Sequence, residues 1–108
     1  MGKFAKKSEI NKGIKKMIEE NALGLATINE KREPHNIAVG FVKVVSNNKL
    51  LITDNCLDET LKNIKYNPKV SLVVWRSDWK KNCIGYKLKG NAEYFTSLVT
   101  INKIKILD

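Results

Sequence analysis

Short apolar segments recur along the whole chain, and short polar turns separate them. Turn clusters at Asn29–Glu33, ahead of Pro34, and at Ser46–Asn48 predict antiparallel strands joined by tight connections. Because strands do not alternate with helices, a βαβ nucleotide-binding fold is disfavoured. Six such segments predict a mainly β fold, a small closed barrel, since closure removes exposed strand edges. The expected strands are residues 23–28, 36–45, 49–53, 69–75, 84–95 and 98–107. Because residues 69–75 are apolar throughout, we expect that strand to be buried on both faces.

Two segments have helical periodicity instead. The first covers residues 8–21, with Ser8 as a candidate N-cap. Its apolar side chains form one stripe with a 3.6-residue period: Ile10, Ile14, Met17 and Ile18. The stripe is aliphatic and glutamates dilute the neighbouring lysines, so we expect this helix to dock on the barrel and not on a membrane. A second, inner helix is expected between a candidate N-cap at Asp58 and a stop at Pro68.

Length and charge limit the class of protein. The chain has 108 residues, which predicts one domain over residues 1–108 that includes the docked helix within residues 1–21. Its net charge is +9, but Arg32 and Arg76 are the two arginines and the other basic residues are lysines. Arginine is preferred for contacts to bases and phosphates, so a solvated surface is favoured over a small anionic ligand or nucleic acid. Without a signal peptide or a long apolar run, we expect a cytoplasmic protein and no membrane segment.

The sequence lacks the common catalytic and metal-binding patterns. The chain has no G-x-S-x-G, P-loop, G-x-G-x-x-G or H-E-x-x-H pattern. His35 stands alone, and Cys56 and Cys83 lack the spacing of metal ligands, so they are expected to be reduced thiols. We therefore assign no catalytic side chain and no metal site.

The junction between the third strand and the inner helix is the most informative segment. A helix start after a strand presents unpaired N–H groups and a positive dipole end, which suit a phosphate. Thr60 would add a hydroxyl donor in the first turn. In the alternative interpretation, Asp58 and Glu59 satisfy the helix dipole and no ligand binds. These residues alone leave both interpretations open.

Four stretches in order together resemble the pyridoxamine 5′-phosphate oxidase-like family of flavin mononucleotide (FMN)-binding split barrels. They are Gly24–Ile28 (GLATI), Asn36–Val45 (NIAVGFVKVV), Leu51–Pro68 (LITDNCLDETLKNIKYNP) and Gly85–Phe95 (GYKLKGNAEYF). The resemblance implies a six-stranded antiparallel split barrel that forms a homodimer, with one FMN at each of two sites between the subunits. One departure from the family is that no helix is expected between Phe95 and the last strand.

The resemblance also implies which residues contact FMN. Those expected under the flavin ring are Asn36, Val39, Gly40 and Phe41, and those expected along the ribityl chain are Thr53, Asp54 and Asn55. Thr60 keeps the second half of a Lys-Thr pair that grips the phosphate. Glu59 stands where the family commonly has lysine, and Asp58 lies beside it. Two carboxylates near a phosphate are repulsive.

The function implied by the resemblance is that of an FMN-dependent oxidoreductase, in which hydride or electrons pass through the flavin. NADH or NADPH and a small-molecule substrate are the implied partners. Trp75, Trp79 or Tyr86 would stack on flavin or substrate, or else pack in the core or an interface. One alternative is a non-catalytic flavin binder or electron carrier at the same site. Another is a basic barrel that binds nucleic acid, although the sequence lacks clustered arginines and an aromatic-basic strand.

Overall fold

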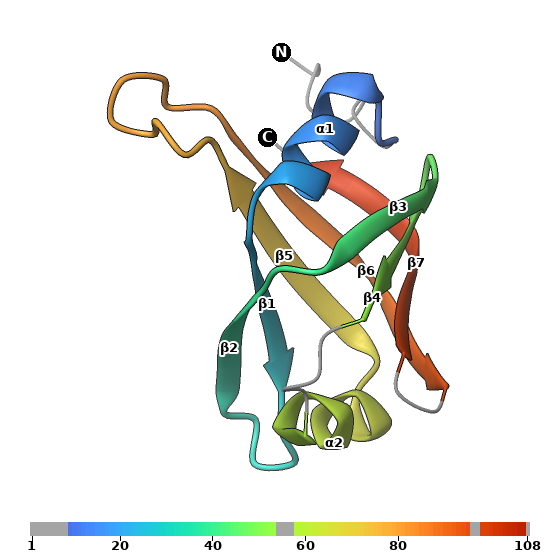
Figure 1. The fold of residues 1–108 in the computed structure, drawn as a ribbon. Coiled ribbons are helices and arrows are strands. Elements are labelled where there is room, and N and C mark those ends of the chain that lie inside the picture. Colours follow the sequence, from blue (N-terminus) through green and yellow to red (C-terminus); the bar gives the residue numbers. More distant parts are fainter. Residues whose placement is uncertain (1–8, 54–57, 96–97, 108) are drawn as a thin grey trace.

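The computed structural model describes residues 9–53, 58–95 and 98–107. Within these residues, seven strands form one sheet accompanied by two helices (Figure 1). The helices are α1 (Lys12–Glu20) and α2 (Asp58–Tyr66). The strands are β1 (Leu23–Ile28), β2 (Pro34–Val39), β3 (Val42–Ser46), β4 (Lys49–Ile52), β5 (Lys69–Trp75), β6 (Gly85–Phe95) and β7 (Leu98–Leu107).

The sheet has the strand order β2-β1-β5-β6-β7-β4-β3, and every pairing is antiparallel. Its two outer strands, β2 and β3, follow each other in the chain and are joined through Gly40 and Phe41. The curled sheet is therefore closed by a covalent link and not by a strand ladder (Figure 1). This arrangement confirms the predicted mainly β antiparallel split barrel.

The seventh strand arises because the expected strand 36–45 is divided in two. Val39 of β2 is buried, and so are Val42 and Val44 of β3. Alternate residues of a strand face opposite sides, so Val39 and Val42 cannot both point inward along one continuous strand. The break at Gly40 and Phe41 restores the inward direction, and the expectation of six strands was wrong for this reason.

Helix α1 begins at Lys12, later than expected. The Asn11 side chain caps it, because Asn11 Oδ1 accepts a hydrogen bond from Ile14 N at 2.9 Å. The expected cap, Ser8, lies outside the described residues. Ile14 and Ile18 are buried in the core, and Glu19 Oε2 accepts a hydrogen bond from Val44 N of β3 at 2.8 Å. Neither described helix is long and apolar enough to cross a membrane.

Strand β5 has the predicted bounds but not the predicted burial. Val70, Leu72 and Val74 are buried, whereas Val73 and Trp75 are 42% and 43% exposed. The prediction that both faces are buried was wrong, since the ladders to β1 and β6 satisfy the backbone of β5 without covering its outer face. The chain passes from β6 to β7 with only residues 96 and 97 between them, so no helix intervenes.

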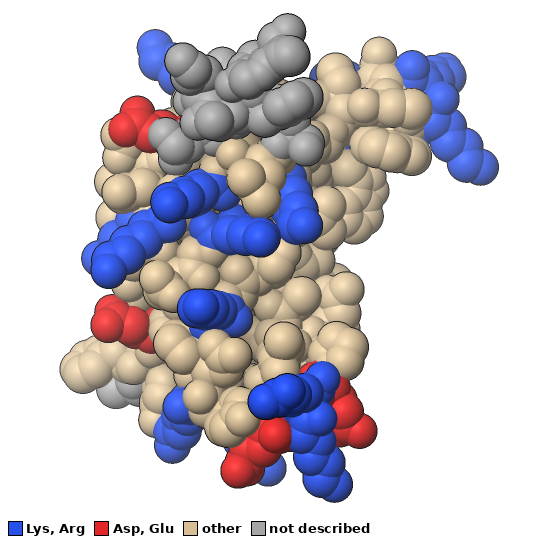
Figure 2. Space-filling view, turned by 180° about the vertical axis from the view of Figure 1, so that it is seen from behind, with Lys and Arg blue, Asp and Glu red and all other residues tan. Residues whose placement is uncertain are grey.

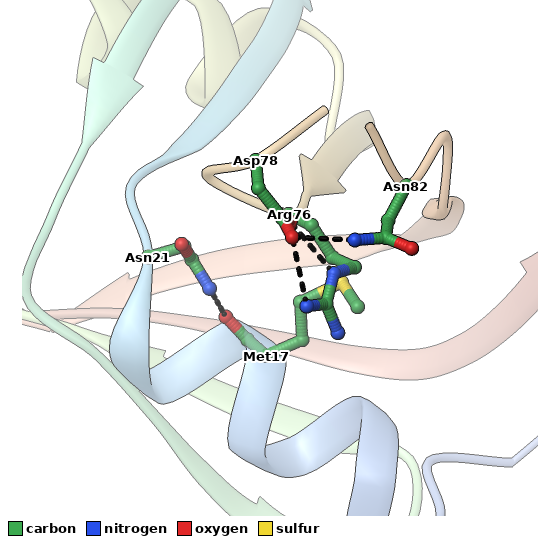
Figure 3. Close-up of polar contacts among 5 residues, drawn as sticks. All are labelled: Met17, Asn21, Arg76, Asp78 and Asn82. Carbon is green, nitrogen blue, oxygen red and sulfur yellow. Dashed lines mark hydrogen bonds and ion pairs between the residues drawn. The ribbon is translucent and has the colours of Figure 1, made fainter. Parts of the chain in front are cut away.

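An ion pair holds the loop between β5 and β6 (Figure 3). Arg76 Nε donates to Asp78 Oδ1 at 2.8 Å, and Asn82 Nδ2 donates to Asp78 Oδ2 at 2.6 Å. The hydrogen bond from Arg76, followed by that from Asn82, lowers the pKa of Asp78 from 3.8 to about 2. Figure 3 also shows the end of α1, where Asn21 Nδ2 donates a hydrogen bond to the Met17 carbonyl oxygen at 2.8 Å.

We expect the order of this loop to depend on pH. The pKa of Asp78 is lowered in the folded protein, so the stabilisation that its carboxylate gives the loop is fully present above about pH 4. This stabilisation is lost as the pH falls through about 2. A carboxyl-detected NMR titration of Asp78 should therefore have its midpoint near pH 2. The Arg76→Gln variant should move that midpoint up toward 3.8. A wild-type midpoint already at the ordinary value would show that the pair does not form.

Candidate functional site

The break between β2 and β3 is held against the end of β4. Thr53 N donates to the Phe41 carbonyl oxygen at 3.0 Å, which brings together two of the predicted flavin-contacting residues. Phe41 is 71% exposed. Apart from its chain neighbours, a Cβ at Gly40 would meet nothing within 4 Å, so the space beside this residue is open. The segment therefore offers open backbone and an exposed ring at the gap in the barrel.

The other two predicted residues of this stretch point to opposite sides of β2. The Val39 side chain is buried, so a ligand can contact only its main chain. Asn36 is exposed and pairs with Ala26 of β1. Its Oδ1 would lie 3.6 Å from a Cβ at Gly24, so the amide lies over the outer face of β1. Asn36 therefore presents a polar side chain and Val39 does not.

Helix α2 is attached to β1 through its buried polar face. Asn63 Nδ2 donates to Thr27 Oγ1 at 2.9 Å, and both residues are buried. Thr60, one turn earlier, is 1% exposed, and its Oγ1 has no hydrogen-bond partner in the described structure. A buried hydroxyl without a partner costs about 1–3 kcal/mol, so such groups call for an explanation. The sequence predicted a donor here but gave no sign that it would be buried and unpaired.

The charge at the start of α2 is acidic. Asp58 and Glu59 occupy the first turn, and both are exposed. Asp58, the expected N-cap, is the first described residue of α2, and the residues before it lie outside the described part of the chain. Their carboxylates complement the positive end of the helix dipole. The predicted ribityl residues Asp54 and Asn55 lie outside the described residues.

The predicted stacking aromatics come together elsewhere. Trp75, Trp79 and Tyr86 line a hollow of about 490 Å³ together with Cys83. Strand β5 starts beside α2 and ends at Trp75, so this hollow lies at the end of β5 far from α2 (Figure 1).

Across the described residues, no three His, Cys, Asp or Glu side chains are grouped to hold a metal ion.

An antiparallel split barrel with one helix inserted between β4 and β5 defines a class of β proteins. A sequence model described as pyridoxamine 5′-phosphate oxidase matches residues 10–102. The chain belongs to this family of split-barrel proteins. An uncharacterised protein of Methanocaldococcus jannaschii is 37% identical over 84 residues, which are 74% of this chain and 52% of that protein. The chain thus spans about half the length of this curated relative.

Solved structures agree on the fold. A protein named for pyridoxamine 5′-phosphate oxidase from Lactobacillus delbrueckii has a TM-score of 0.76 at 19% identity, over 93% of each chain. An FMN-binding protein of Syntrophomonas wolfei has a TM-score of 0.64 at 12% identity, over 97% of this chain and 86% of that one. HutZ, the heme storage protein of Vibrio cholerae, has a TM-score of 0.55 at 13% identity, over 91% and 89%. At these identities the likeness concerns the fold alone.

Proposed function

We propose that this chain is an FMN-binding flavoprotein and that it acts as an FMN-dependent oxidoreductase. The observation that carries the proposal is the buried Thr60 hydroxyl, which lacks a partner in the described structure and lies in the first turn of α2. A phosphate oxygen would supply the missing acceptor, and the free N–H groups of the helix start would add further donors. Because the hydroxyl is buried, we expect the start of α2 to shift when the phosphate binds.

The open backbone at the gap between β2 and β3 is where we place the other parts of FMN. In this proposal the flavin ring lies against the main chain of Val39, Gly40 and Phe41, with the Asn36 amide beside it. The ribityl chain lies along residues 53–55. The ring carries the redox chemistry when it is bound, and the protein positions it and excludes water.

The names of two neighbours in structure suggest different cofactors, and the chain's own residues favour the flavin. One neighbour is named as FMN-binding and another as a heme storage protein. A protein commonly holds heme iron through an axial histidine, cysteine, methionine or tyrosine. His35 is the single histidine of the chain, and it is partly buried in β2. An orphaned hydroxyl at a helix start suits a phosphate, which FMN has and heme lacks.

We propose further that two subunits complete the site. Phe41 is 71% exposed beside the gap, and Val73 and Trp75 are partly exposed on the outer face of β5. Exposed apolar groups of this kind suit an interface with a second copy. NADH or NADPH would reduce the flavin, and a small-molecule substrate would reoxidise it. Steady-state oxidation of NADH or NADPH separates this oxidoreductase from a flavin binder or electron carrier without turnover.

An absorption measurement tests the cofactor. Purified protein is mixed with excess FMN or with hemin, passed through a desalting column and examined in the visible range. We expect retained flavin absorbance in the blue after FMN and no retained Soret band after hemin. A retained Soret band without retained flavin would overturn the proposal in favour of heme.

The acidic start of α2 gives a second prediction. Replacing Glu59 with lysine removes a negative charge near the proposed phosphate and adds a positive one. We expect FMN to bind about ten-fold more tightly or better, since each close charge contact is worth on the order of a few kcal/mol at intermediate dielectric. Glu20→Lys, an equally exposed change at the end of α1, is the matched control. Equal effects of the two substitutions would place the phosphate away from α2.

A further inference from the structure

Lysines gather on the outer face of β5, β6 and β7. Figure 2 shows blue side chains grouped over the middle of this face, with red side chains toward its margins. Beneath them lies a hollow of about 570 Å³. Its polar lining comes from four adjacent strands, β1, β5, β6 and β7, and consists of Thr27, Lys69, Ser71, Lys89, Asn91, Lys103 and Lys105. No carboxylate lines it, and no ion pair to these lysines occurs in the part of the chain described.

The strand register forces these charges together. Lys89 of β6 lies directly opposite Lys105 of β7. Like charges directly opposite each other on a sheet are destabilising. Glu93, the nearest acidic residue along β6, accepts a hydrogen bond from Asn102 and forms no ion pair with either lysine among the described residues. An anion in the hollow would remove this repulsion.

A bulge adds another lysine to the same face. Lys103 and Ile104 of β7 together oppose Gly90 of β6, where the register shifts by one residue. Ile104 is buried, while Lys103 is exposed and has a positive φ of 54°. Bulges re-aim side chains beside functional sites. Here the bulge keeps the isoleucine in the core and leaves the neighbouring lysine in the lining of the hollow.

The other end of the hollow is apolar. Ala26, Ile28 and Pro34 line it at the β1–β2 end of the sheet, and Val70 and Gly90 line it as well. The volume is that of a site for one small molecule. No arginine or aromatic residue is among the lining residues, although nucleic-acid surfaces favour both. The hollow therefore has lysines for phosphates at one end and an apolar surface for an organic group at the other.

We propose that this hollow binds a small organic oligophosphate, such as a nucleoside triphosphate. The lysines contact the phosphate groups as point charges, and Ser71 and Asn91 supply neutral donors. None of the described residues proposed to hold FMN lines this hollow, although Ala26, the strand partner of Asn36, does.

Calorimetric titration with tripolyphosphate and with ATP, at low and at raised salt, tests the proposal. The hollow variant is Lys89→Gln with Lys105→Gln, and the control variant is Lys12→Gln with Lys15→Gln on the exposed face of α1. Both variants lose the same net charge. We expect the hollow variant to bind each probe about ten-fold more weakly or worse and the control variant to bind as wild type does. Binding should weaken as salt is raised.

Two further measurements keep the outcomes distinct. At low salt the melting temperature of the hollow variant should be no lower than that of wild type, because the substitutions relieve the repulsion between Lys89 and Lys105. The variant should quench FMN fluorescence as wild type does. Tighter binding of ATP than of tripolyphosphate supports a contact to the organic group, and equal binding supports the phosphate contacts. Absence of binding at millimolar probe, or equal loss in both variants, overturns the proposal. A 20-nucleotide DNA strand that binds more tightly than ATP, and only with these lysines present, overturns it in favour of nucleic acid.

Discussion

Gly90→Ala is expected to lower the free energy of unfolding by about 1–3 kcal/mol, as overpacking a well-packed core does. A Cβ at Gly90 would lie 2.6 Å from Ile101 Cγ2 and 2.9 Å from the Asn102 carbonyl oxygen. The carbonyl belongs to the bulge of β7 and cannot turn away as a flexible side chain would. Thermal unfolding should reveal a fall in melting temperature of roughly 5 to 15 °C.

Gly40→Ala is the matched control for this prediction. The same methyl group is added, but nothing lies within 4 Å of it. We expect stability to change by no more than about 0.5 kcal/mol, as for substitutions away from packed features. Equal melting temperatures for the two variants would show that Gly90 is not closely packed against β7 at the bulge.

Thr60→Val should separate stability from cofactor binding. The substitution removes a buried hydroxyl that has no partner in the described structure, and valine retains nearly the same shape. Without cofactor, the variant should be more stable than wild type by about 1 kcal/mol. Its affinity for FMN should fall about ten-fold or more, since a hydrogen bond to a charged group is worth about 1.5–3 kcal/mol.

The opposite signs of these two effects distinguish a cofactor contact from a structural role. Thr100→Val on β7 serves as the control, because that residue is only partly buried and lies outside the proposed site. We expect it to leave FMN affinity unchanged. A Thr60→Val protein that is less stable and binds FMN normally would mean that the hydroxyl has an internal partner.

The strands were predictable because their pattern is local. The predicted strands 23–28 and 69–75 match β1 and β5 at both ends. Asn29 favours a turn directly after β1, and Pro68 ends the helical segment directly before β5. The division of residues 36–45 was not predicted although Gly40 stands at the break, because an isolated glycine within a strand also fits a bulge or a close backbone approach. It follows from a tertiary requirement, that Val39 and Val42 both point into the core. Likewise, only the assembled sheet reveals that the outer face of β5 is uncovered.

The candidate site was predictable in part. The resemblance selected Gly40, Phe41 and Thr53, and the structure joins the last two by a hydrogen bond. That Thr60 is buried depends on how α2 packs on β1 through Asn63, which no local pattern reveals. The lysine-lined hollow was missed for a similar reason. Lys89 and Lys105 are far apart in the sequence and become neighbours only through the strand register.

A titration of FMN with the protein, monitored by flavin fluorescence alongside the molar mass in solution, tests the central claim most directly. The proposal predicts saturable quenching with one FMN per subunit and a mass twice that of the chain. Unquenched FMN at millimolar protein, with the protein folded and monomeric, would contradict it.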